Sequence, residues 1–224
     1  PTVSKRRFVD ADVAKLFEVY FYREYPVMGE TEAQVCCWID QQIKEFDVVV
    51  VPDFGNGFIS TAMVESLCAN AKYLAVNTQV NSGNRGFHVI HRYPRADFAS
   101  LNEPEVRLAA HNRHDPIETV GSHVSDSVHA KHFAITRGTK GVMLLDRPKG
   151  MMHSVPALST KVVDRIGAGD AFLSLAGMCL GGGLPAEVAA FVGSAAAALD
   201  VQIVCNREPI SPIGLNKYIT TLLK

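Results

Sequence analysis

Polar and apolar residues alternate in two short segments at the start of the chain. Residues 3–8 (VSKRRF) and 15–22 (KLFEVYFY) each place polar side chains in turn with apolar or aromatic ones, and a short Asp-rich turn at 10–12 separates them. Such alternation predicts the two strands of a β-ribbon. Because an isolated ribbon is only marginally stable, this one must pack on a body or a partner.

From Thr31 onward the pattern changes to amphipathic helices and short apolar runs. Helices are predicted at 31–45, 58–69, 103–111, 117–130, 168–180 and 185–199, with a last one opening at Ser211-Pro212. Strands are predicted at 48–51, 73–76, 97–101, 132–136, 142–146 and 161–163, and residues 77–96 are predicted to form a loop. Continuous apolar strands that alternate with helices are typical of an α/β fold with a parallel sheet covered on both faces.

The size and charge of the chain fit one compact soluble domain. It has 224 residues, 47% of them hydrophobic, with 22 Lys and Arg against 23 Asp and Glu. We expect residues 1–24 to form the ribbon and residues 25–224 to form the core. A net charge of -1 provides neither a basic surface for nucleic acid nor one for a membrane.

The cysteines and the longest uncharged stretch favour a cytoplasmic protein. Five cysteines, two of them adjacent, are poor material for a disulfide framework and suggest reduced thiols. Residues 171–186 carry no charge but include three consecutive glycines and Pro185, and they are too few to span a bilayer. The chain begins with Pro1 instead of Met, which indicates processing or a segment of a longer protein.

The most informative motif is the turn of small residues Gly167-Ala168-Gly169 that opens a long apolar helix. Free backbone amides at a helix N-terminus, next to glycines that allow close approach, can bind an anion without a charged side chain. Asp170 follows in the first helical turn, where the helix dipole favours its ionised form. A carboxylate beside an anion site can take the proton of an alcohol during phosphoryl transfer. The alternative is an Asp that only caps its helix.

Two other kinds of phosphate-binding protein are disfavoured. The sequence contains no GxxxxGK[ST] motif, and neither of its Gly-x-Gly turns continues to the third glycine of a dinucleotide fingerprint. A P-loop NTPase and a Rossmann dehydrogenase are therefore poor explanations of this chain.

A second Gly-rich turn follows the all-valine strand and contains Asp53, Gly55, Asn56 and Gly57. In an open α/β sheet, ligands bind beyond the carboxyl ends of the strands, so these residues could contact a substrate or a metal ion. The alternative is a plain connection between a strand and a helix.

Two further turns also allow two interpretations each. Asn102 and Glu105 stand three apart at a helix start, where Glu105 could bind Mg²⁺ through water or the pair could cap the helix. The turn at 136–141 (TRGTKG) could contact nucleotide phosphates or could be the basic tip of a hairpin. A group of histidines could in principle bind Zn²⁺, although histidines on helix surfaces are usually solvated; these are His111, His114, His123, His129 and His132.

The four motifs, in the order DFGNG, NEPE, TRGTKG and DRIGAGDAF, resemble those of the ribokinase-like (PfkB) carbohydrate kinase family. The opening PTVSKRRFVD…KLFEVY is similar to that of the heptose-phosphate kinase domain of bifunctional ADP-heptose synthesis enzymes. The resemblance implies a three-layer α/β/α fold with a mostly parallel sheet and a small β lid. It also implies ATP and Mg²⁺ as cofactors, a sugar or sugar phosphate as substrate, and a possible homodimer formed through the lid ribbon.

Carried over to this sequence, the resemblance assigns roles to individual residues. Asp170 would be the catalytic base, and the anion hole would consist of Gly167, Ala168 and Gly169. The residues near ATP, Mg²⁺ or both would be Asn102, Glu105, Thr136, Arg137, Gly138, Gly141 and Ser194, with Glu105 on the metal side. The sugar would contact Asp53, Gly55, Asn56 and Gly57.

The sequence also departs from the family pattern. Family members usually carry a further N-terminal segment with sugar-contacting glycines, and the residues from Pro1 onward do not include it. Arg165 stands where Thr is common, and the segment 77–86 replaces one of the Asp-Pro-Lys type. Two rival functions therefore stay open: a kinase of the same fold for a nucleoside or vitamin precursor, and a kinase-like binding or assembly module that has lost turnover.

Overall fold

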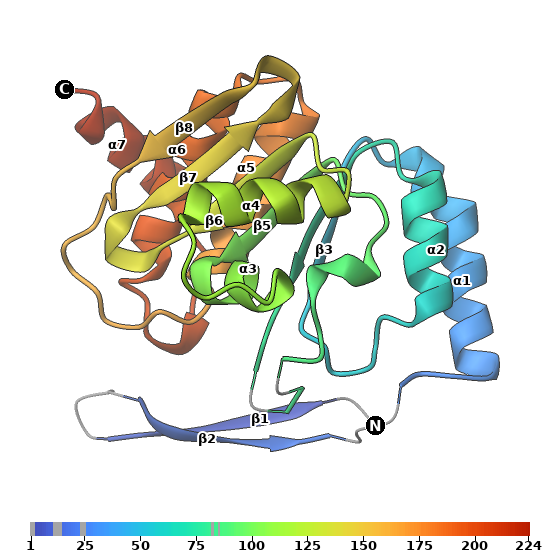
Figure 1. Ribbon diagram of the computed structural model, residues 1–224. Helices are drawn as coiled ribbons and strands as arrows, with labels where there is room; N and C mark the ends of the chain where they lie inside the picture. The colour runs from blue at the N-terminus through green and yellow to red at the C-terminus, as the bar shows by residue number, and fades with distance from the viewer. Residues whose placement is uncertain (1–2, 11–14, 23–25, 82, 85) are drawn as a thin grey trace.

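A six-stranded sheet in the order β3-β4-β5-β6-β7-β8 forms the centre of the molecule (Figure 1). The computed structural model describes residues 3–10, 15–22, 26–81, 83–84 and 86–224. The strands are β3 (Val49–Asp53), β4 (Leu74–Thr78), β5 (Phe98–Asn102), β6 (His132–Thr136), β7 (Val142–Asp146) and β8 (Met151–Val155). The first four are parallel, and β7 runs antiparallel to both of its neighbours. The expectation of a mostly parallel sheet is confirmed.

Helices cover both faces of this sheet. They are α1 (Glu30–Gln42), α2 (Thr61–Asn70), α3 (Glu103–Ala109), α4 (Ile117–Ser127), α5 (Ala168–Gly181), α6 (Ala186–Asp200) and α7 (Pro212–Leu222). Short 3-10 turns occur at Ile43–Glu45, Ile90–Arg92, Gly138–Lys140, Arg147–Lys149 and Val204–Asn206. The helices α2, α3 and α4 lie on one side of the sheet and α5 and α6 on the other, which gives the three-layer α/β/α arrangement (Figure 1).

The strands are buried on both faces because neighbouring residues point into different layers. On β4, Leu74 and Val76 belong to the apolar cluster that contains Val64 and Leu67 of α2. Ala75, between them, belongs to the cluster that contains Phe172 of α5. Burial on both sides explains why the strands are continuous apolar runs in the sequence.

The ribbon is formed by β1 (Ser4–Val9) and β2 (Lys15–Phe21), which pair in antiparallel fashion. It lies apart from the sheet, across the edge where the parallel strands end (Figure 1). Arg7 attaches it to the body through a 2.8 Å hydrogen bond to the carbonyl oxygen of Cys205, and the Lys5 ammonium lies 4.8 Å from the centre of the Phe54 ring. The predicted ribbon is confirmed, while residues 11–12 of its predicted turn lie outside the described residues.

One predicted strand is wrong, and one real strand was not predicted. Residues 161–163 form no strand; instead the amide groups of Val163 and Asp164 donate to the carbonyl oxygen of Val201 at the end of α6. The last strand is β8, at Met151–Val155, ten residues earlier. Most of its side chains are exposed or half-exposed, because β8 is at the edge of the sheet, and its sequence lacks the apolar run of the inner strands.

Some helix boundaries also differ from the prediction for local reasons. α2 begins at Thr61, three residues late, because the Ser60 side chain caps it by accepting a hydrogen bond from the amide of Met63. The helix predicted at 31–45 ends at Gln42 and continues as a 3-10 turn. Within the described part of the chain, no helix combines the length and the apolar character needed to cross a membrane.

Candidate active site

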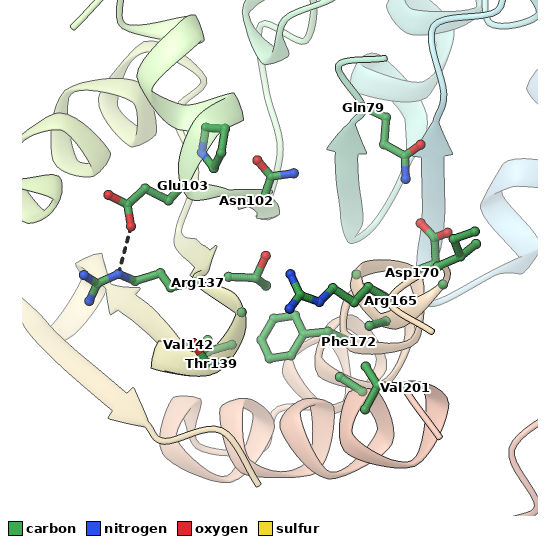
Figure 2. Close-up of a pocket in the computed structure, with 18 of the residues that line it drawn as sticks. Gln79, Asn102, Glu103, Arg137, Thr139, Val142, Arg165, Asp170, Phe172 and Val201 are labelled. Carbon is green, nitrogen blue, oxygen red and sulfur yellow. Dashed lines mark hydrogen bonds and ion pairs between the residues drawn. The ribbon is translucent and has the colours of Figure 1, made fainter. Parts of the chain in front are cut away.

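A cavity of about 1340 Å³ lies where β4, β5 and β6 end, between the lid ribbon and the start of α5. Its lining brings together residues that are far apart in the sequence (Figure 2). The predicted site residues that line it are Asn102, Thr136, Arg137, Gly138, Gly141, Gly167, Ala168, Gly169, Asp170 and Ser194. Three of the four motifs therefore meet in one place, as expected for turns that share one edge of a sheet.

The turn before α5 has the backbone of an anion site. Gly167 is the N-cap of α5 with φ +94°, and a Cβ there would fall 2.5 Å from the Asn206 side-chain nitrogen, so the position requires glycine. A Cβ on Gly169 would meet no atom within 4 Å. The first turn of a helix leaves its amides without intrahelical partners. Open space beside such amides is suited to a phosphate group.

Asp170 is held by a residue that the sequence analysis did not single out. The side-chain nitrogen of Asn77, a buried residue on β4, lies 3.3 Å from Asp170 Oδ1. Burial raises the pKa of Asp170, while the hydrogen bond from Asn77 and the charge of Lys5 oppose this rise without cancelling it. Asn77 could have been found in the sequence as a polar residue that directly follows a buried strand. It was missed because residues 77–96 were predicted to form a loop.

Asn102 and Glu105 cap α3. The amide of Glu105 donates to Asn102 Oδ1 at 2.9 Å, and the amide of Asn102 donates to Glu105 Oε2 at 2.9 Å. Glu105 Oε1 accepts a third hydrogen bond, from the amide of Val80 at 3.2 Å. Burial raises the pKa of Glu105, with a further contribution from the charge of Asp170, and the backbone hydrogen bonds only partly oppose this. Asn102 lines the cavity, whereas Glu105 lies behind it.

The turn at 136–141 and α6 provide further polar groups of the cavity. Arg137 Nε lies 3.2 Å from a carboxylate oxygen of Glu103, and the dashed line in Figure 2 marks this pair. Ser194 on α6 is buried, and its hydroxyl has no hydrogen-bond partner in the part of the chain that the structure describes. A buried hydroxyl without a partner is costly unless a ligand or water completes it.

The turn after β3 is arranged differently. Asp53 is buried, and its carboxylate contacts Arg92 at 2.8 Å, Tyr93 at 2.7 Å and His88 at 3.0 Å. Burial alone would raise the pKa of Asp53, but hydrogen bonds from His88 and Tyr93 and the nearby positive charges outweigh it, so this pKa is lowered. Asp53 thus stabilises the turn through protein contacts.

A second cavity, of about 460 Å³, lies beside the turn after β3. Asp53, Phe54 and Asn56 line it, and Lys5 and Phe54 also line the larger cavity. Gly55 and Gly57 line neither of these two cavities. The lid residue Lys5 therefore connects the two spaces and stands next to both Asp-containing turns.

The comparison with protein families agrees with this geometry. A profile described as "pfkB family carbohydrate kinase" matches residues 39–210. The chain belongs to this family. The assignment made from the four motifs is confirmed, and with it the placement of the chain among carbohydrate kinases.

Relatives of known name extend the comparison beyond the family. "Bifunctional protein HldE" of Granulibacter bethesdensis is 27% identical over 209 residues, which cover 90% of this chain and 42% of the relative. The protein of the same name from Trichlorobacter lovleyi is 28% identical over 200 residues, which cover 85% and 40%. The chain therefore spans about 40% of the length of these pfkB relatives.

Solved structures confirm the ribokinase-like fold. Thermotoga maritima ribokinase has a TM-score of 0.76 at 18% identity, covering 98% of this chain and 70% of that one. Escherichia coli phosphofructokinase-2 in complex with potassium has a TM-score of 0.71 at 15% identity, covering 93% and 67%. Arabidopsis thaliana ribokinase, complexed with ribose and ATP, has a TM-score of 0.69 at 16% identity, covering 98% and 69%.

Proposed function

We propose that this chain transfers the γ-phosphoryl group of ATP to a hydroxyl group of a sugar or sugar phosphate. The observation that carries the proposal is the placement of Asp170, a half-buried carboxylate in the first turn of α5, next to the open space at Gly169. A base and an anion site in contact are the two parts that phosphoryl transfer to an alcohol requires.

In the proposed reaction the acceptor hydroxyl lies against the Asp170 carboxylate. The hydroxyl oxygen attacks the γ-phosphorus while its proton moves to Asp170. Asn77 fixes the orientation of the carboxylate by its hydrogen bond to Oδ1. The amides at Gly167, Ala168 and Gly169 bind the oxygens of the transferred group as negative charge develops on them.

The nucleotide is proposed to lie along the opposite side of the cavity. The turn at 136–141, with Thr136, Arg137, Gly138 and Gly141, contacts the phosphates, and the unpartnered hydroxyl of Ser194 faces the nucleoside. Arabidopsis ribokinase, a structural neighbour, was solved with ATP.

Mg²⁺ is proposed to bind near Asn102 and Glu105. Both carboxylate oxygens of Glu105 already accept backbone hydrogen bonds. The ion would therefore be held mainly by water and phosphate oxygens, with Glu105 acting through water. Mg²⁺ usually keeps several waters and takes few protein ligands when phosphates are present. When bound, the ion neutralises negative charge on the phosphates.

The sugar is proposed to bind between Asp170, Lys5 and the turn after β3. Asp53 and Asn56 line the small cavity there, while Gly55 and Gly57 belong to the turn but do not line the cavity. The relatives named HldE and the resemblance of the ribbon favour a sugar phosphate as acceptor. The need for ATP makes the cytoplasm the expected compartment.

A second copy of the chain is proposed to cover the lid ribbon. Its exposed apolar side chains include Leu16, Phe17 and Phe21, which are 62%, 52% and 53% exposed. Apolar ribbon residues of this size favour association with another surface.

The substitution Asp170→Asn tests the proposed function. We expect Asp170→Asn to reduce sugar-dependent ADP release by about 1,000-fold while nucleotide binding, followed by thermal shift, is kept. Asp47→Asn is the matched control, because Asp47 is 89% exposed. The acceptor panel is ribose, fructose 6-phosphate and a heptose phosphate. Unchanged turnover in Asp170→Asn would contradict the role of Asp170, and binding of ATP without turnover in the unmodified protein would favour the binding-module alternative.

A further inference from the structure

Arg165 is a cationic side chain of the larger cavity to which the proposed reaction above assigns no role. It lines the cavity and precedes the Gly167–Gly169 turn by two residues. Figure 2 shows its side chain extending across the cavity, away from Asp170 and towards the side where Asn102 and Arg137 lie. In the described part of the chain, its guanidinium group has no hydrogen-bond or ion-pair partner.

Three other arginines that line the same cavity are paired with carboxylates. Arg7 pairs with Glu18 at 3.2 Å, and Glu103 pairs with both Arg107 at 2.9 Å and Arg137 at 3.2 Å. Glu103, on the side towards which Arg165 points, therefore already forms ion pairs with two other arginines. The guanidinium of Arg165 keeps all its donors available for a ligand.

The backbone that carries Arg165 is fixed by several hydrogen bonds. Asp164, the preceding residue, accepts hydrogen bonds from the amides of Ile166 at 3.1 Å and Cys205 at 2.9 Å. The amide of Asp164 itself donates to the carbonyl oxygen of Val201 at 3.1 Å. A turn that is fixed before the ligand arrives reduces the entropic cost of binding, so that only the exposed side chain of Arg165 still has to be ordered by the ligand.

We propose that Arg165 is a further catalytic residue, which binds the phosphate chain of ATP and neutralises the charge that develops on the oxygen bridging the β- and γ-phosphorus atoms. In the transfer, the acceptor oxygen forms its bond to the γ-phosphorus and the bond from the γ-phosphorus to the bridging oxygen breaks. The electron pair of that bond stays on the ADP oxygen next to Arg165, and the acceptor proton moves to Asp170. This inference rests on the proposed function.

The chemistry of arginine fits this role better than that of a small polar residue. The guanidinium is always charged, and its planar donors match two phosphate oxygens at once. Such a group strengthens its interaction as negative charge moves to the leaving oxygen, so it stabilises the transition state more than the bound ATP. Arg165 and Asp170 would then act on the two ends of the same transfer, the leaving oxygen and the attacking oxygen.

The test compares Arg165→Thr and Arg165→Lys with Arg147→Thr in the full chain. Arg147 is the matched control, since it pairs with Asp126 away from the cavity. We expect Arg165→Thr to lower kcat about 100-fold with a smaller rise in KM for ATP, and Arg165→Lys to lie in between. Added guanidinium ions should restore part of the kcat of an Arg165→Ala variant and leave Arg147→Thr unchanged.

Failure of this inference is distinguishable from failure of the proposed function. If Asp170→Asn is inactive but Arg165→Thr turns over as fast as the unmodified protein or faster, Arg165 is a bystander or an obstruction and the inference is wrong. If no protein turns over, binding of ADP is measured instead by thermal shift. Loss of ADP stabilisation in Arg165→Thr, but not in Arg147→Thr, would support contact with the phosphates, and equal stabilisation in both would overturn it.

Discussion

Two turns of this protein have a similar composition, rich in Asp and Gly, but their aspartates differ in how completely they are paired with other side chains. In the turn after β3, Asp53 is surrounded by Arg92, Tyr93 and His88, and all of these contacts come from the protein. At the turn that opens α5, the Asp170 carboxylate has one hydrogen bond among the described residues, from Asn77, and it stands beside an open cavity. A motif of this kind therefore becomes a site only where the fold leaves its polar groups incompletely paired.

The pKa values of the carboxyl groups follow the same division. Positive charges and hydrogen bonds outweigh burial at Asp53 and lower its pKa. Burial dominates at Asp170, and also at Asp200, whose pKa rises to about 6 through burial and the charges of Asp170 and Asp164. Raised pKa values in a cleft are typical of functional sites, whereas a lowered value at a saturated carboxylate is typical of a structural one.

The substitution Asp53→Asn should produce the largest loss of stability. Removing the charge leaves the half-buried Arg92 guanidinium and the buried Tyr93 hydroxyl beside a neutral group, which costs about 3 kcal/mol. Urea unfolding measures this difference, with Asp170→Asn as the comparison from the other turn. Because folding lowers the pKa of Asp53, its ionised carboxylate stabilises the folded state fully at pH values above the ordinary carboxyl pKa. This stabilisation is lost as the pH falls through the pKa of Asp53 in the folded state. If the two variants had the same free energy of unfolding, Asp53 would not be the more completely paired carboxylate, and the contrast between the two turns would be wrong.

The glycines of the two turns sharpen the comparison further. Gly55 has φ +69°, and a Cβ there would lie 2.5 Å from the Asn84 side-chain nitrogen and 2.6 Å from His88 Cγ. We expect Gly55→Ala to cost about 2 kcal/mol in the free energy of unfolding. Gly169→Ala places a methyl group in the open space beside α5 and replaces glycine by a better helix former, so the free energy of unfolding should rise by about 0.5 kcal/mol. The same methyl group occupies the proposed phosphate site, so ADP binding should weaken about 10-fold.

Thermal unfolding and ADP titration of both alanine variants check this prediction. Gly183→Ala serves as a control for positive φ without a close contact, since its φ is +81° and no atom lies within 4 Å of the added Cβ. If Gly169→Ala binds ADP as tightly as the unmodified protein, the space beside Gly169 is not where the phosphates bind.

The sequence allowed prediction of the inner strands and of the motif positions, because these depend on local patterns. β6 and β7 were placed at their observed bounds, since apolar runs buried on both faces stand out from their surroundings. β8 was missed because an edge strand needs no such run. The partners of Asp53 and the hydrogen bond from Asn77 to Asp170 join residues more than 30 positions apart, and no local pattern records them.

A stability effect that depends on pH is expected at Asp200, at the end of α6. Its carboxylate is buried, one of its oxygens has no hydrogen-bond partner among the described residues, and the charges that act on it, from Asp170 and Asp164, are of like sign. Its pKa of about 6 lies above that of an unfolded chain, so the folded state binds the extra proton and stability falls as the pH rises from about 4 through 6. Asp200→Asn should therefore leave stability unchanged at pH 4 and raise it by about 2 kcal/mol at pH 8. Urea unfolding at both pH values measures this, with Asp47→Asn expected to change neither. A variant that is less stable at pH 8 would mean that Asp200 is paired like Asp53, and the contrast between saturated and unsaturated carboxylates would then not extend beyond Asp170.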